Sequence, residues 1–356
     1  MEDNKKATET AAPVHKRRPH YKGTHPRKFS EKYKELNPEK YADTIAKIRE
    51  KGNTPAGTHV PIMVQEILDF LDIQSGQIGL DATLGYGGHT IEMLKKLNHT
   101  GHIYGLDVDP VESAKTRERL EKHGFDKEDV TVTLLNFAKI DEMAKKYGPF
   151  DFILADLGVS SMQIDNPERG FSFKREGPLD LRLDQTHGVP ASVRLKHVKF
   201  DEFKEMLIQN ADEPYADQIA REVFHRRKHH IPIETTKDLY DVVDTALAFL
   251  PKKERPQAVK KSAQRVFQAL RIDVNHEFEA LETFMDKLPL ALKSGGRVAI
   301  LTFHSGEDRR VKKAFKEGVR TGLYSDVARY VTRPSEEECR QNSRATCTKM
   351  RWAIKA

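Results

Sequence analysis

A chain of 356 residues is longer than one compact domain usually needs, so we expect a main domain with an insertion or a second domain. Its 38% hydrophobic and 32% charged residues indicate a globular protein with a real core, and no run of about 18 apolar residues predicts a membrane span. The net charge is +6, and two cysteines, Cys339 and Cys347, match no zinc-site spacing and cannot staple so long a chain, so a reducing, cytoplasmic location is expected.

The N-terminal segment, residues 1–55, holds the whole charge excess. It contains 14 Lys and Arg against 8 Asp and Glu. Its composition predicts a basic and largely disordered extension, within which the apolar pattern of residues 29–51 predicts one or two short helices. Two interpretations stay open, a solvated tail or an RNA-contacting arm, because clustered Lys and Arg neutralise phosphates without reading sequence.

After this extension, helical and extended patterns alternate. A helix is predicted over residues 61–71, and further helices follow the first and second strands, at residues 91–97 and 110–122. Apolar runs predict parallel strands at residues 77–80, 102–107, 130–135 and 151–156. This alternation is typical of an α/β fold with a doubly wound, mostly parallel sheet.

The alternation stops after the fourth strand. Residues 166–262 show helical patterns, including 200–209 and 216–225 and a helix capped by Thr235, and they predict an inserted all-helical domain. The core domain resumes with a long helix over 264–284, a fifth strand over 297–303, a helix near 309–317 and an apolar piece near 350–354. The predicted division is therefore an extension (1–55), a first core part (56–165), the insertion (166–262) and a second core part (263–356).

A glycine turn between the first strand and its helix predicts a nucleotide-like cofactor. Glycines let a ligand approach the backbone, and the helix start offers free N–H groups. A dinucleotide fingerprint would need a third glycine where Thr90 stands. Asp107, at the end of the second strand, suits a ribose diol, and Asp81 suits the positive amino end of a cofactor, directly or through water. These residues favour S-adenosylmethionine over a dinucleotide.

Six motifs, in order from about residue 59 to the C-terminus, resemble those of the bacterial 16S rRNA (cytosine-N4)-methyltransferases, the family that methylates a decoding-site cytidine. The motifs are Thr58–Glu66, Asp81–His89, Asp156–Asp165 with its continuations Arg169–Phe173 and Gly177–Arg182, Phe267–Asn275, Phe303–Arg309 and Arg333–Glu338. The resemblance implies a class I Rossmann-like methyltransferase fold, S-adenosylmethionine as cofactor, and 16S rRNA or the 30S subunit as partner.

The resemblance also implies site residues. It places cofactor binding on Gly87, Gly88, His89, Asp107, Phe137, Asp156 and Gln163. Asp156 is the leading candidate to accept a hydrogen bond from the N4 amine and aim its lone pair at the methyl group, a reaction driven mainly by positioning. No metal is expected, because the leaving group is a neutral thioether.

Other candidates have two interpretations each. Asp180 is a candidate second carboxylate or a partner of Arg182, and His304 is a candidate substrate residue or part of a polar turn. Phe171 and Phe173 are candidates to stack a flipped cytosine or to fill the core. The cluster His225–His230 is a candidate phosphate-binding face or a solvated helix end, and its lack of partner acids argues against a metal site.

Three departures from the family pattern suggest a divergent or second-copy member. They are the long basic extension, Gly306 in place of a leucine, and a loosened C-terminal motif over residues 342–351. The alternatives left open are a methyltransferase acting on another RNA, DNA or protein, and a non-enzymatic RNA-binding assembly factor with a vestigial cofactor loop.

Overall fold

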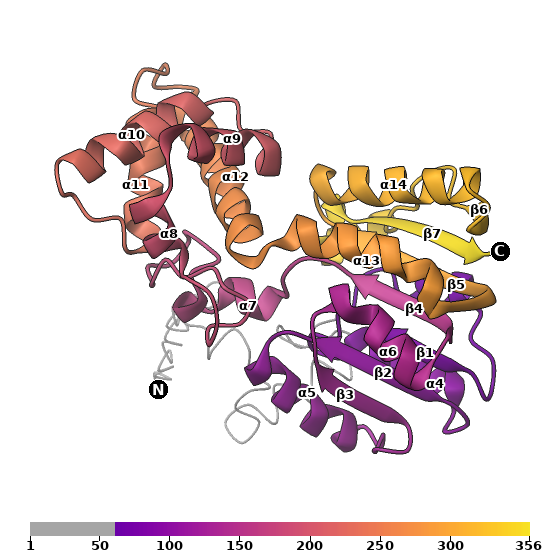
Figure 1. The fold of residues 1–356 in the computed structure, drawn as a ribbon. Helices are drawn as coiled ribbons and strands as arrows, with labels where there is room; N and C mark the ends of the chain where they lie inside the picture. The colour runs from indigo at the N-terminus through magenta and orange to yellow at the C-terminus, as the bar shows by residue number, and fades with distance from the viewer. Residues whose placement is uncertain (1–60) are drawn as a thin grey trace, which may run out of the picture. The chain divides into compact units, whose positions relative to one another are not determined.

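The computed structural model describes residues 61–356, and the predicted N-terminal extension lies outside this range. Its centre is a seven-stranded sheet in the order β3-β2-β1-β4-β5-β7-β6 (Figure 1). The strands are β1 (Ile78–Asp81), β2 (His102–Asp107), β3 (Val130–Leu134), β4 (Phe150–Asp156), β5 (Leu292–Thr302), β6 (Tyr324–Val327) and β7 (Lys349–Lys355). No helix in the described range is long and apolar enough to cross a membrane.

The first five strands run parallel, as their apolar sequences predict. β1 pairs in parallel with both β2 and β4, and β4 pairs in parallel with β5, whereas β7 runs antiparallel beside β5. The chain passes from β3 to the far side of β1 when it forms β4, which makes the carboxyl ends of β1 and β4 the point where the strand order reverses. Ligands of open α/β sheets bind at such a point.

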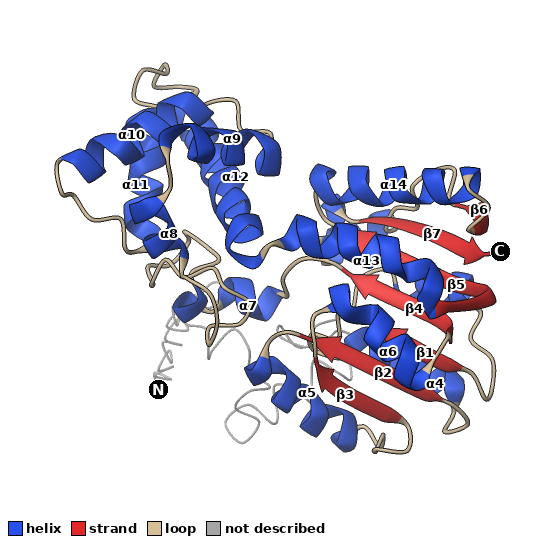
Figure 2. Cartoon of the chain, viewed as in Figure 1, coloured by secondary structure: helices blue, strands red, loops and turns tan. Residues whose placement is uncertain are grey.

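Helices cover both faces of the sheet (Figure 2). Alternate residues of one strand face opposite sides, so Phe152 and Leu154 pack in one apolar cluster and Ile153 and Ala155 in another. The first cluster includes side chains of α3 (Val64–Leu71), α4 (Gly88–Leu97) and α5 (Pro110–Lys122). The second includes α6 (Ile140–Tyr147), α13 (Glu277–Ala291) and α14 (Ser305–Arg320). The doubly wound α/β fold predicted from the sequence is confirmed.

The segment between β4 and β5, up to the end of α12, forms a helical domain with its own core. Its helices are α7 (Ser161–Asp165), α8 (Ala191–His197), α9 (Phe200–Ala211), α10 (Ala216–Lys228), α11 (Thr236–Ala246) and α12 (Arg255–Asn275). Thr235 caps α11 as predicted, with its hydroxyl accepting from Asp238 N–H at 3.1 Å. The core contains buried residues from α8 to α12, up to Leu270. The predicted domain boundary at 262/263 therefore falls inside α12.

One predicted helix is divided in two, and two elements were not predicted. The single helix expected over 264–284 is two helices, because His276 adopts a left-handed conformation (φ 51°) between α12 and α13. No helix was expected between the third and fourth strands, where α6 lies. No second antiparallel strand was expected near the C-terminus, where β6 pairs with β7. A short helix, α15 (Glu336–Gln341), precedes β7.

Candidate active site

A cavity of about 340 Å³ lies at the carboxyl ends of the central parallel strands. Its wall comes from the glycine turn after β1, the ends of β2 and β4, the start of α7, and the junction of α12 with α13. Segments far apart in the chain therefore meet at the edge where the strand order reverses, as the parallel sheet requires.

The glycine turn is shaped by two left-handed residues. Gly85 (φ 47°) and Gly87 (φ 75°) adopt conformations that disfavour other residues, and a Cβ on Gly87 would lie 2.8 Å from Thr116 Cγ2. A Cβ on Gly88 would lie 2.8 Å from Pro61 Cγ. Gly88 lines the cavity, whereas Gly87 lies behind it and shapes the turn. The glycines thus serve both backbone conformation and close packing.

Asp81 stabilises this turn by accepting hydrogen bonds. It is 1% exposed, and its carboxylate accepts hydrogen bonds from Thr90 Oγ1 at 2.6 Å and from Thr83 N–H at 3.1 Å. Asp81 is absent from the cavity wall, so the direct contact with a cofactor's amino end that the sequence suggests has no support in its position. Thr90, which replaces the third glycine of a dinucleotide motif, is its partner in this link between β1 and α4.

Asp107 ends β2 and lines the cavity. Its two oxygens accept backbone hydrogen bonds from Gly85 N–H and Asp109 N–H, both at 2.8 Å. Burial and the nearby Asp109 charge outweigh these bonds and raise the pKa of Asp107 to about 6. Each carboxylate oxygen can accept more than one hydrogen bond, so the side chain retains capacity for the hydroxyl groups of a ribose.

Asp156 ends β4 and faces the same cavity. Its Oδ1 is buried without a hydrogen-bond partner among residues 61–356, and its Oδ2 lies 3.5 Å from His89 Nδ1. Burial raises the pKa of Asp156 to about 6, with His89 opposing the rise and the charges of Asp81 and Glu307 adding to it. An unpartnered buried acceptor is costly unless a ligand supplies the donor.

His89 is 8% exposed and lies between the cavity and α3. Its Nε2 is 2.9 Å from the Ile62 carbonyl oxygen. A carbonyl only accepts, so Nε2 carries a proton, and Nδ1 is the nitrogen free to share a proton with Asp156. His89 thus lines the predicted cofactor site and contacts Asp156.

Two further predicted residues line the cavity. Phe137 follows β3 and its ring packs edge-on against Phe284 with centroids 5.2 Å apart. Gln163 is largely buried: its Oε1 accepts from Ser160 N–H at 2.9 Å and its amide donates to Asp109 Oδ2 at 3.1 Å. Hydrogen bonds within the protein therefore fix the orientation of the Gln163 amide.

Asp109, which the sequence analysis missed, supports the site from outside the cavity wall by contacting Asp107 and Gln163. It is 1% exposed, caps α5 and accepts from both Gln163 and Arg169, whose Nη1 lies 2.7 Å away. Arg169 also donates to the Leu183 carbonyl at 2.7 Å, so this pair ties the inserted segment to the end of β2. The signal in the sequence was an Asp before Pro110, the usual residue pair at a helix start.

The remaining predicted candidates lie outside the cavity wall. Both Asp180 oxygens are engaged by Arg182 at 2.8 Å, which agrees with the pairing considered from the sequence. Phe171 is buried in the inserted domain, and Phe173 stacks on Tyr240 with centroids 5.2 Å apart, so their positions match the core interpretation. His304 stands at the start of α14 and is absent from the cavity wall.

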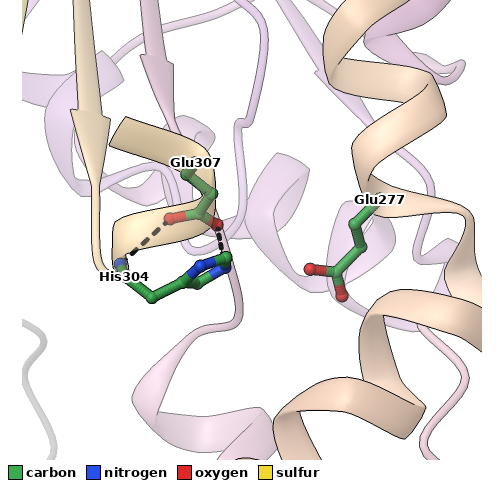
Figure 3. A group of neighbouring side chains, drawn as sticks. All are labelled: Glu277, His304 and Glu307. Atoms are coloured by element: carbon green, nitrogen blue, oxygen red, sulfur yellow. Dashed lines mark hydrogen bonds and ion pairs between the residues drawn. The ribbon is translucent and has the colours of Figure 1, made fainter. Parts of the chain in front are cut away.

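His304 belongs to a group with Glu277 and Glu307 (Figure 3), whose ligand-type atoms lie within 4.8 Å of one another. Glu307 contacts His304 Nε2 at 3.1 Å, and Glu277 points toward the pair from α13. Arg271 already binds both oxygens of Glu277 at 2.8 Å. Because this guanidinium would repel a cation, the group is better suited to joining α12, α13 and α14 than to holding a metal.

Gly306 has a packing explanation. A Cβ at this position would lie 2.6 Å from Phe278 Cζ and 3.2 Å from His304 Nδ1. The ring of Phe278 thus fills the space that a side chain at position 306 would need. Glycine at this position therefore fits its neighbour Phe278, which is itself part of the cavity wall.

The basic cluster at the end of α10 is only partly available to a ligand. Arg226 donates to Glu222 at 2.9 Å, and Arg227 donates to the Val198 carbonyl at 2.6 Å. Lys228 and the histidines at 225, 229 and 230 are exposed. The two arginines therefore stabilise the helix end, which favours the structural interpretation for two of the cluster's three Arg and Lys residues.

Comparisons with known proteins match most of the chain to one family of methyltransferases. A family model described as "MraW methylase family" matches residues 56–356. "Ribosomal RNA small subunit methyltransferase H 1" of Lachnoclostridium phytofermentans is 60% identical over 349 residues, 98% of this chain and 95% of that protein. The protein of the same name in Agathobacter rectalis is 59% identical, covering 96% of this chain and 98% of its own length. "Ribosomal RNA small subunit methyltransferase H 2" of Acholeplasma laidlawii is 53% identical, with all of both chains covered.

Proposed function

This chain belongs to the MraW methylase family, and we propose that it transfers a methyl group from S-adenosylmethionine to N4 of a cytidine in the 16S rRNA of the small ribosomal subunit. It is an S-adenosylmethionine-dependent methyltransferase, and its relatives' names supply ribosomal RNA as the substrate class. The observation that carries the choice of an amino group is the buried, unpartnered Oδ1 of Asp156 in the cavity wall.

The residues of the cavity suit the cofactor. Asp107 would hold the ribose hydroxyls, Phe137 offers a ring beside the end of β3 for the adenine, and the backbone of the turn around Gly88 allows close approach. Gln163 closes the wall next to Asp109. When bound, S-adenosylmethionine supplies an electrophilic methyl on a sulfonium and leaves as a neutral thioether.

Asp156 would orient the target amine. The N4 lone pair of cytosine is delocalised into the ring, so the nitrogen is a weak nucleophile. A carboxylate that accepts a hydrogen bond from one N4 proton draws electron density toward the nitrogen and fixes the direction of its lone pair. An acceptor-only group selects an N–H donor over a carbonyl oxygen, and this preference separates cytosine from uracil at the same position.

His89 would complete this acceptor. Alkylation makes N4 acidic, and the proton it loses must reach a base. Oδ2 of Asp156 faces His89 Nδ1 at 3.5 Å, and the Ile62 carbonyl fixes the opposite ring nitrogen as a donor. Asp156 takes the proton and becomes a neutral carboxyl group; before the transfer, a proton shared with His89 Nδ1 stabilises its carboxylate.

We also propose that the substrate is the whole 30S subunit and that the protein acts in the cytoplasm. The test is incubation of the full chain with methyl-labelled S-adenosylmethionine and 30S subunits or free 16S rRNA, followed by digestion to nucleosides and mass spectrometry. N4-methylcytidine is the expected product. Label in another nucleoside, in DNA or in protein would overturn the substrate assignment, and failure to bind the cofactor would favour an RNA-binding assembly factor.

A further inference from the structure

A groove on the inserted domain carries positive charge that its surroundings leave free. It has a volume of about 530 Å³ and lies between α12 and the turn that joins α9 to α10. Lys261 and Arg265 line it from α12, and Lys253 lines it from the turn just before that helix. Both lysines are exposed, and neither forms a hydrogen bond or ion pair within residues 61–356.

The charges form a stripe that begins in the turn before α12 and continues along the helix. Gln257, Lys261 and Arg265 follow one another at intervals of four residues on α12, a rise of about 12 Å at 1.5 Å per residue, and Lys253 precedes them. Lys252 and Lys260, both exposed, add positive charge beside the stripe, whereas Glu254 and the buried Glu213 oppose it. The cations outnumber the acids, and the surface is positive.

This arrangement does not help the helix itself. Cations near a helix start oppose its dipole, and α12 has no acid in its first turn. Lys261 and Arg265, four residues apart, repel each other. Since Lys253 and Lys261 form no hydrogen bond or ion pair that would stabilise the fold within residues 61–356, an anionic ligand is the better explanation of their arrangement.

Contacts of the buried Glu213 hold the two sides of the groove in place. Glu213 is 3% exposed, and its Oε1 accepts from Ser262 Oγ at 2.8 Å and from Tyr215 N–H at 3.0 Å. Arg265 lies 3.9 Å from its other oxygen. These contacts hold the α9–α10 turn against α12, so that Tyr215, which is half-buried, forms a wall opposite the lysines. An aromatic ring beside a row of cations is the usual form of a single-strand binding surface.

The same helix reaches the candidate active site. Arg271 and Asn275, at the C-terminal end of α12, line the cofactor cavity. Asn275 is anchored by donating to the Leu181 carbonyl and accepting from Leu183 N–H, both at 2.7 Å. The helix that carries Lys261 and Arg265 therefore also reaches the cavity that a target base would enter, and Figure 1 shows α12 running from the inserted helices to α13.

We propose that this groove binds the sugar–phosphate backbone of the rRNA strand that carries the target cytidine, in single-stranded form. The inference rests on the proposed function. Phosphate contacts position a strand without reading its sequence, so the groove sets the path and the cavity at Asp156 selects the base. An acidic protein segment is the competing ligand.

The test compares two double variants of the full chain, Lys253→Gln with Lys261→Gln, and Lys312→Gln with Lys316→Gln. The control lysines are exposed on α14 and lie four residues apart. Affinity for a fluorescently labelled single-stranded RNA is measured between about 50 and 200 mM salt, where the logarithm of affinity falls with the logarithm of salt by about 0.7 per phosphate contact. Cofactor binding by calorimetry verifies that each variant is folded.

The groove variant is expected to lower the salt slope by about 1.4, the loss of two phosphate contacts, while the control variant keeps the parental slope. An unchanged slope in the groove variant, or an equal reduction in both variants, would overturn the proposal. Binding of an acidic peptide that displaces no RNA would assign the groove to a protein instead. If the parental enzyme binds RNA but methylates none, the proposed function fails while the salt slopes still decide on the groove.

Discussion

Replacing Asp156 with asparagine removes the carboxylate that faces the target amine and keeps the shape of the side chain. An amide oxygen still accepts one hydrogen bond, but it cannot take a proton. Positioned acid–base groups contribute about 10²–10⁴-fold to rate, so we expect Asp156→Asn to lower the methylation rate within this range. Cofactor affinity should change much less, because the loss concerns the acceptor of the methyl group.

The pH profile gives a sharper expectation. With a pKa of about 6, raised mainly by burial, Asp156 is about nine-tenths ionised near pH 7 and about one-tenth ionised near pH 5, so kcat/KM should fall about tenfold between them. Asp156→Asn should lack this acid limb. His89 lowers the pKa of Asp156, so His89→Gln should move the limb to higher pH.

The assay is transfer of labelled methyl to 30S subunits at saturating cofactor, across buffers of constant ionic strength. Asp180→Asn is the matched comparison, because Asp180 was the other carboxylate candidate and is bound by Arg182 outside the cavity. It should keep the acid limb near pH 6. A limb that survives in Asp156→Asn, or disappears in Asp180→Asn, would refute the assignment of the acceptor to Asp156.

Three further expectations concern cofactor binding and stability. Asp107→Ala should weaken S-adenosylmethionine binding, and unchanged affinity by calorimetry would contradict its ribose role. Arg169→Met should lower the free energy of unfolding by about 3–5 kcal/mol in urea titrations, because it leaves the Asp109 carboxylate buried without its cation; a loss below 1 kcal/mol would refute this. Gly306→Ala should cost about 1–3 kcal/mol through its overlap with Phe278. Phe278→Leu should abolish that cost, and persistence of the cost in the double variant would disprove the steric explanation.

The sequence predicted the parts of the fold that depend on local pattern. Apolar runs located the parallel strands, and the segment from Pro110 to Lys122 matches α5 at both ends, because proline and the preceding aspartate mark its start. The break at His276 was missed because a left-handed non-glycine residue leaves no clear mark in the sequence. α6 was missed although Ile140, Met143 and Tyr147 have helical spacing.

In the candidate site, too, some features were predicted from the sequence and others were missed. The resemblance named residues that line the cavity, including Asp107, Phe137 and Asp156. The physical argument for Asp81 did not anticipate that Thr90 and Thr83 bind its carboxylate outside the cavity wall. The contact between His89 and Asp156 joins residues separated by most of the first core part, and sequence spacing alone does not reveal such a pair.

The order of the strands also bears on how the chain is made. β4 must pair with β5, yet the whole inserted domain separates Asp156 from Leu292. During synthesis, β4 is therefore complete while one of its edges has no partner, and an open edge invites pairing with other chains. The inserted helices make mostly local contacts, which form quickly, so they can fold while the sheet waits for β5. Completion of the sheet then depends on the arrival of β5, which makes this late, long-range pairing the step most exposed to aggregation.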